Sequence, residues 1–130
     1  MTKNSGKNDA SVLVVDGDIV SRHAIADYLR NCGYSVIETA NTDEAYLAMG
    51  EQSLSIDIVL VAVIGMDARE AFEVANWAGS NRPGVLVKLA GNVDSAARTA
   101  AGLCDSGPHL KRPYEPEMIV DYIKRMRAKL

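Results

Sequence analysis

The chain has 130 residues, of which 48% are hydrophobic and 24% are charged, and its formal net charge at pH 7 is −3. This size and composition fit one soluble globular domain with its own core, and they exclude a disordered protein. No apolar run approaches the ~20 residues that span a bilayer, and the acidic net charge gives no domain-wide footprint for nucleic acid.

The N-terminus and the cysteines indicate the compartment. Residues 1–10 are polar and lack the apolar core of a signal peptide, so we expect a loose tail on a cytoplasmic protein, with the domain in residues 11–130. Cys32 and Cys104 lie far apart without CxxC spacing. We therefore expect two reduced thiols that pack in the core rather than a disulfide or a metal pair.

The first half of the chain alternates between short apolar runs and helical patterns. Residues 12–15 predict a buried strand, and a helix follows over residues 19–32. Gly33 occupies the position where a helix favours a left-handed residue. A second strand is predicted over residues 34–39. Asn41 and Glu44 then suit the cap of a helix that continues through Met49.

The second half continues the alternation. Residues 56–64 form a nearly continuous apolar run, as expected of a central parallel strand, and the later elements are predicted in this order: a helix over 67–77, a strand over 85–89, a helix over 95–104, a short fifth strand at His109–Leu110, and a last helix from Pro116. Five strand–helix repeats predict an α/β fold with a five-stranded parallel sheet. The expected strand order is the flavodoxin-like 2-1-3-4-5.

In such a fold the site lies at the carboxyl ends of the strands. The predicted strand ends would bring together these residues: Asp16, Gly17, Asp18, Ala62, Ala90, Lys111 and Arg112. The central strand ends at Ala62, whose methyl group has no acid–base or nucleophilic chemistry.

Several motifs have the order and spacing of one known family: Val-Leu-Val-Val-Asp (12–16), Arg22, Ile25, Leu29, Gly33-Tyr34, Asn-Thr-Asp-Glu-Ala (41–45), Met66-Asp67 and Arg-Pro-Tyr (112–114). Their combination over about residues 11–130 resembles the receiver domain of bacterial response regulators, the CheY-like family. The resemblance implies a (βα)5 three-layer sandwich and a role in two-component or phosphorelay signalling.

The same resemblance indicates that the phosphorylation pocket is degenerate. Asp16 matches the family's first acid, and Gly17 replaces its second. Ala62 replaces the aspartate that attacks phosphorus, Ala90 replaces a Ser or Thr, and Arg112 replaces a lysine. A methyl group cannot form an acyl phosphate. The chain is therefore expected to be a pseudo-receiver that is not phosphorylated.

No other acid is expected to restore the pocket. Asp57 lies ~16 Å back along the central strand, at about 3.3 Å per residue. Asp67 suits the cap of the third helix, while Asp18 could point into the pocket or cap the first helix. We expect no cofactor and at most weak Mg²⁺ binding, for which Asp16 and Asp18 are the weak candidates. Arg112 either pairs with these two acids and fixes one conformation or lies in solvent.

Protein binding is then the leading function. The resemblance implies a contact face formed by the fourth helix, the fifth strand and the fifth helix, which would include Ala96, Ala97, Ala100, His109, Lys111, Tyr114 and Tyr122. Homodimerisation or docking to an output domain through this face is expected, without nucleic acid or membrane. His109 is either a pH-responsive switch or a surface residue of the fifth strand.

The alternative function is enzymatic. Asp16-Gly17-Asp18 also resembles the Asp-x-Asp start of haloacid-dehalogenase-type phosphatases, in which the first acid attacks phosphorus and the second acts as acid–base. The fourth strand ends without Ser or Thr, and no later acid pair follows a strand. We therefore expect no enzyme.

Overall fold

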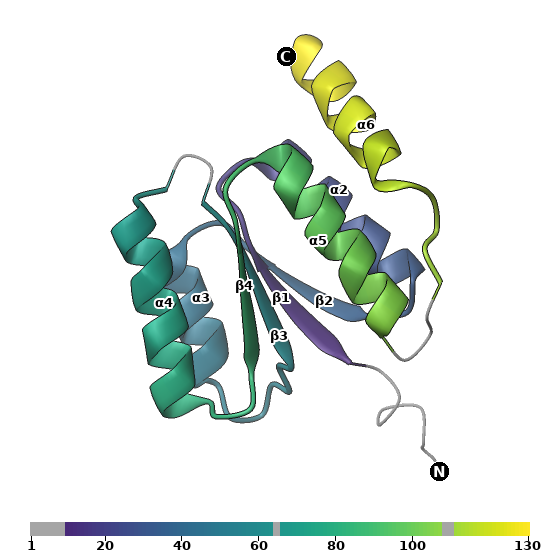
Figure 1. Ribbon diagram of the computed structural model, residues 1–130. Coiled ribbons are helices and arrows are strands. Elements are labelled where there is room, and N and C mark those ends of the chain that lie inside the picture. Colours follow the sequence, from purple (N-terminus) through teal and green to yellow (C-terminus); the bar gives the residue numbers. More distant parts are fainter. Residues whose placement is uncertain (1–9, 64–65, 108–110) are drawn as a thin grey trace.

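The structure, a computed structural model, describes residues 10–63, 66–107 and 111–130. Its elements are, in chain order, β1 (Ser11–Val15), α2 (Ile19–Asn31), β2 (Ser35–Thr39), α3 (Thr42–Gly50), β3 (Ile58–Ala62), α4 (Ala68–Asn81), β4 (Leu86–Ala90), α5 (Val93–Ser106) and α6 (Pro116–Ala128) (Figure 1). The described residues thus form four of the five predicted strands. The predicted fifth strand, at His109–Leu110, lies outside them.

The four strands are parallel and lie in the order β2-β1-β3-β4, which is the order predicted for them. The register pairs Val15 of β1 with Thr39 of β2 and with Val61 of β3, and it pairs Ala62 with Ala90 of β4. Every residue of β3 is buried. This is why its sequence is apolar throughout rather than alternating.

Helices cover both faces of the sheet (Figure 1). Alternate residues of a strand point to opposite faces, and β1 divides in this way. Val12 and Val14 belong to the core on the side of α2 and α5, whereas Leu13 and Val15 belong to the core on the side of α3 and α4. The predicted three layers are therefore present.

The C-terminal half of the chain departs from a regular repeat. After β4, α5 lies on the face opposite α4, where it packs against α2. The last helix, α6, packs against both α2 and α5 and lies farthest from the sheet (Figure 1). Ile119, Val120 and Ile123 supply the buried side of α6.

A disulfide joins Cys32 to Cys104, so the expectation of two reduced thiols is wrong for this structure. The two cysteines are 72 positions apart, and Cys104 lies in α5 while Cys32 is the C-cap of α2. They meet because α5 packs along α2, which the spacing in the sequence does not indicate.

The helix caps follow the sequence closely. Asn41 accepts a hydrogen bond from the Glu44 amide, and Glu44 accepts one from the Ala40 amide, which is the predicted cap. Asp67 caps α4, and Gly33 has the left-handed φ of 110° expected after α2. Within the ranges that the structure describes, none of the helices is both long and apolar enough to cross a membrane.

Candidate functional site at the carboxyl ends of the strands

Five of the seven predicted pocket residues meet at the carboxyl ends of the strands. Asp16, Gly17 and Asp18 directly follow β1, while Ala62 and Ala90 are the last residues of β3 and β4. Because the register pairs Val15 with Val61, Asp16 follows β1 at the level where β3 ends. Ala62 and Ala90 are paired and buried, so this part of the site presents only methyl groups.

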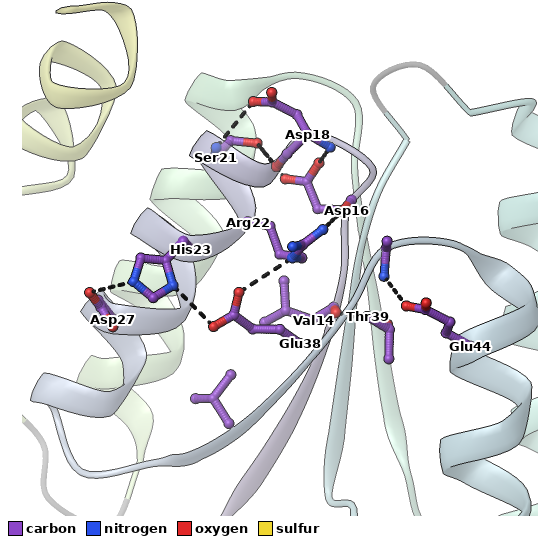
Figure 2. Close-up of polar contacts among 12 residues, drawn as sticks. Val14, Asp16, Asp18, Ser21, Arg22, His23, Asp27, Glu38, Thr39 and Glu44 are labelled. Carbon is purple, nitrogen blue, oxygen red and sulfur yellow. Dashed lines mark hydrogen bonds and ion pairs between the residues drawn. The ribbon is translucent and has the colours of Figure 1, made fainter. Parts of the chain in front are cut away.

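Asp16 is a buried carboxylate that is fully engaged with its own loop. It is 1% exposed, one oxygen accepts from the Asp18 amide at 2.9 Å, and the other accepts from the Ser21 hydroxyl (Figure 2). Burial raises the pKa of Asp16 above its ordinary value, although the hydrogen bonds from Ser21 and the Asp18 amide act in the opposite direction. The two hydrogen bonds thus hold the carboxylate away from solvent.

Asp18 both caps α2 and binds an arginine from the far end of the chain. Its Oδ2 accepts from the Ser21 amide at 3.1 Å and from Nε of Arg127 at 3.1 Å, with a second bond from Arg127 Nη2. Partial burial raises the pKa of Asp18, but the bonds from Arg127 and Ser21 outweigh it and leave the pKa below its ordinary value. Of the two alternatives for Asp18, the cap of the first helix is confirmed.

Arg127 is the site residue that sequence reasoning missed. In the sequence it is one of several basic residues near the end of the last helix, where the helix dipole favours cations. Nothing in that pattern distinguishes Arg127 from its neighbours. Its role depends on how α6 packs against α2, which brings residue 127 to the start of α2.

Lys111 and Arg112 do not join the pocket, so this part of the prediction is wrong. They line a cavity of about 420 Å³ with Pro113 and the end of α2, residues Asn31, Cys32 and Gly33. That end lies at the amino edge of the sheet, because α2 runs back from Asp18 to the start of β2.

Arg112 instead pairs with acids close to it in the chain. Its Nη2 lies 2.7 Å from Asp105 and its Nη1 lies 3.0 Å from Glu115. These bonds raise the pKa of Arg112, with the Asp105 hydrogen bond as the main cause. The hypothesis that Arg112 pairs with Asp16 and Asp18 is therefore wrong, and Arg127 makes the contact with Asp18.

The residues present do not fit a Mg²⁺ site of the family's kind. Among the described residues, no group of three or more His, Cys, Asp or Glu side chains could hold a metal ion. The oxygens of Asp16 already accept hydrogen bonds, and Asp18 is bound by Arg127. A Cβ at Gly17 would meet only the Ala40 carbonyl, at 3.5 Å, so the missing second acid is not a steric requirement.

The remaining acids near β3 do not replace the missing carboxylate. Asp57 accepts from the Ser11 amide at 2.8 Å, which places it at the amino edge of the sheet beside the start of β1. Asp67 accepts from the Arg69 amide at 2.9 Å and caps α4. Both positions agree with the sequence interpretation.

A second polar cluster, centred on Glu38 of β2, lies beside the first helix. Glu38 binds Arg22 at 3.3 Å and His23 at 3.2 Å (Figure 2). It also binds Arg30 at 3.0 Å. Burial raises the pKa of Glu38, but the bonds from Arg30, His23 and Arg22 outweigh it and lower the pKa overall. Arg22 also donates to the Asp16 carbonyl at 3.3 Å, so the cluster connects β2 to the pocket loop.

The predicted contact face is only partly present. Ala96, Ala97 and Ala100 are buried because α5 packs against α2 and α6, so they cannot form a docking face. Tyr114 and Tyr122 are exposed, whereas His109 lies outside the described residues. The prediction that these three alanines belong to the contact face is therefore wrong.

No family model matches the chain. Among curated proteins it is 40% identical over 53 residues to the two-component response regulator-like protein APRR7 of Arabidopsis thaliana, covering 41% of this chain and 7% of that protein. It is 36% identical over 58 residues to the two-component response regulator-like protein PRR37 of rice, covering 45% and 8%.

A third relative is a cyclic di-GMP phosphodiesterase of Thermotoga maritima, 32% identical over 77 residues, which covers 59% of this chain and 20% of that protein. The chain thus spans a fifth or less of each of these curated relatives. Among solved structures, a response regulator from Thermotoga maritima matches 92% of this chain and 98% of that chain, with a TM-score of 0.57 and 20% identity.

The structural match is too distant in sequence to indicate more than the fold. The sequence relatives add that part of the chain resembles segments of response regulator-like proteins. The comparisons therefore show a fold shared with a response regulator and a partial sequence similarity to response regulator-like proteins.

Proposed function

We propose that this receiver-type domain acts in signal transduction by binding a protein partner, without being phosphorylated at the end of β3. The observation that carries this proposal is Ala62. It is the last residue of the central strand, it is buried, and it is paired with Ala90. A methyl group offers no nucleophile, so the covalent step has no acceptor there.

The charges of the pocket support the same function. Arg127 donates two hydrogen bonds to Oδ2 of Asp18, so a divalent cation would compete with an arginine for this carboxylate. Asp16 is enclosed by Ser21 and the Asp18 amide. Protein groups therefore satisfy these two carboxylates without a metal.

The same contacts disfavour the alternative phosphatase. A nucleophilic Asp16 would have to approach a phosphorus atom, yet its carboxylate is 1% exposed and both of its oxygens accept hydrogen bonds. Asp18 would have to exchange protons as an acid–base, but its pKa lies below the ordinary value. We therefore propose binding rather than turnover.

The test is incubation with acetyl phosphate and Mg²⁺, followed by intact mass measurement, together with NMR spectra of the pocket amides on addition of beryllium fluoride and Mg²⁺. We expect no phosphoryl adduct and no change at Asp16–Asp18. A receiver that retains its acceptor aspartate, treated in the same solution, serves as the positive control. A stable adduct would contradict the proposal, and Asp16→Asn, Asp18→Asn and Asp67→Asn would then identify the acceptor.

A further inference from the structure

The disulfide joins two cysteines that differ in their access to solvent. Cys32, the C-cap of α2, is 5% exposed, whereas Cys104 lies in the last turn of α5 and is 0% exposed. In thiol–disulfide exchange a thiolate attacks one of the two sulfurs, and access helps to decide which sulfur it attacks. Of the two residues, Cys32 is therefore the one that a reactant from solution can reach.

A cavity lies against Cys32. Its volume is about 420 Å³, within the range of about 300–1,000 Å³ that is typical of pockets for small molecules. The described residues that line it are Asn31, Cys32, Gly33, Lys111, Arg112 and Pro113. A small molecule in this cavity would contact Cys32 while Cys104 stays behind it in the core between α2 and α5.

The charges at the cavity favour an anionic reactant. Arg112 lines the cavity, but Asp105 and Glu115 balance its charge. Lys111, on the same wall, is exposed and adds a further cation. A nearby cation attracts an anionic molecule and favours the thiolate form of a thiol. The negative end of the α2 dipole acts in the opposite direction, so the preference should be modest.

We propose that Cys32 is a site of thiol–disulfide exchange with a small anionic thiol, for which glutathione is the probe. The thiolate attacks Sγ of Cys32, a new S–S bond forms between them, and the bond to Cys104 breaks. The electron pair of the broken bond stays on Sγ of Cys104, which then takes a proton. Attack by Cys104 on the mixed disulfide reverses the step and releases the thiol.

The burial of Cys104 determines how fast this exchange can be. A thiolate in apolar surroundings is disfavoured, and a thiol that is reluctant to ionise is a poor leaving group. The exchange should therefore be slower than that of an exposed disulfide. Once Cys104 ionises, it lies next to the mixed disulfide and can restore the original bond. The site thus follows the sustained redox state of the solution rather than brief changes.

Exchange at Cys32 would remove the covalent link between α2 and α5. The last helix, α6, packs against both of these helices, so its position depends on how they are held together. The Tyr34 hydroxyl still donates to the Leu103 carbonyl at 2.5 Å, which keeps α5 close to the end of α2. The step would be an input that needs no phosphate acceptor at the end of β3. It goes beyond the function proposed above and does not depend on it.

The test is incubation of the folded, oxidised chain with glutathione, an acid quench, and mass analysis of the cysteine peptides. We expect the glutathione adduct on Cys32 together with a free Cys104. Two single-cysteine variants, treated with oxidised glutathione, provide the matched comparison. Cys104→Ser should form the adduct, and Cys32→Ser should react more slowly by about tenfold or more, because its remaining thiol is buried. Circular dichroism checks that each variant is folded, and if one is not, the peptides of the unmodified chain decide.

The choice of an anionic thiol is tested by comparing glutathione with cysteamine, a cationic thiol of similar reactivity. Lys111→Gln should lower the ratio of the two exchange rates by about twofold or more. Lys88→Gln, an exposed change on β4, is the control and should leave the ratio unchanged.

An adduct found mainly on Cys104 would overturn the proposal. So would a folded chain that forms no adduct while the urea-unfolded chain does, because the disulfide would then be structural only. A ratio that Lys111→Gln does not change would overturn the preference for an anionic thiol. None of these outcomes bears on the phosphoryl adduct, which acetyl phosphate tests separately.

Discussion

Arg127, in the last turn of α6, donates two hydrogen bonds to the carboxylate of Asp18, which lies 109 positions earlier and caps α2. The two ends of the domain therefore meet at the acidic loop after β1. Among the described residues, Asp18 is the only carboxylate of the pocket with a cationic partner. The contact therefore links the position of α6 to this carboxylate. The state of the loop and the position of α6 are coupled by one side chain.

Replacing Arg127 with glutamine should raise the pKa of Asp18 toward its ordinary value of about 3.9. The arginine is the largest of the influences that lower this pKa, although partial burial acts against them. Because the paired side chains are 37% and 32% exposed, we expect a loss of only about 0.5–1 kcal/mol at neutral pH. Carboxyl chemical shifts against pH measure the first effect, and urea unfolding measures the second.

The pH dependence of this variant has a defined sign. A carboxyl whose folded pKa is depressed stabilises the fold above its unfolded pKa, and the contribution is lost as pH falls through the folded value. The difference in stability between Arg127→Gln and the unmodified chain should therefore disappear at low pH. Lys124→Gln, an exposed change on the same helix, is the control and should show no such difference. If the stability of the two variants depends on pH in the same way, the Arg127–Asp18 pair makes no specific contribution to the free energy of unfolding.

Asp16→Asn should stabilise the domain at neutral pH. Burial raises the pKa of this carboxyl, so the folded state disfavours its charge. For such a group the stabilising contribution is present below the unfolded pKa and is lost as pH rises through the folded value. An uncharged amide avoids that loss and can still accept from the Asp18 amide. We expect a higher melting temperature at pH 7 and a smaller difference near pH 3. A lower melting temperature at pH 7 would indicate that Ser21 requires the carboxylate.

Local features of the fold could be predicted from the sequence, because they depend on neighbouring residues. The strand β3 follows from an unbroken apolar run, and the caps at Asn41 and Asp67 follow from side chains that satisfy free amides of a helix. The strand order follows from the regular alternation of elements. Ala62 could be placed at the end of β3 for the same reason.

Contacts between distant segments could not be predicted. The periodicity of α5 shows which of its residues are buried, but it does not show which face of the sheet the helix covers. Three predictions are wrong because they depend on such contacts: the reduced cysteines, the contact face that includes the alanines of α5, and the position of Lys111 and Arg112 in the pocket. Arg127 was missed because its partner, Asp18, is defined only by the packing of α6.

The disulfide should contribute strongly to stability. It closes a loop of 72 positions, for which the chain-entropy model gives about 4 kcal/mol. Cys32→Ser with Cys104→Ser should therefore lower the urea midpoint substantially and should abolish any response to reductant. Alkylation of the denatured, unreduced chain, read by intact mass, should detect no free thiol. Full alkylation without reductant would contradict the pairing.

Gly107 should not tolerate a methyl group. It is the C-cap of α5, and a Cβ there would collide with the hydroxyl of Tyr34, which donates to the Leu103 carbonyl at 2.5 Å. Its φ is −84°, so the obstacle is the close approach of Tyr34 rather than the backbone conformation. We expect Gly107→Ala to cost about 1–3 kcal/mol, as overpacking of a well-filled site does.

Gly102, inside the same helix, is the matched control. A Cβ at this position meets nothing within 4 Å, and alanine favours a helix over glycine by about 1 kcal/mol. Gly102→Ala should therefore leave stability unchanged or raise it, while Gly107→Ala lowers it. Adding Tyr34→Phe to Gly107→Ala should recover part of the loss, because it removes the oxygen that the methyl group meets. Equal effects of the two alanine variants in urea unfolding would mean that the end of α5 does not pack against Tyr34.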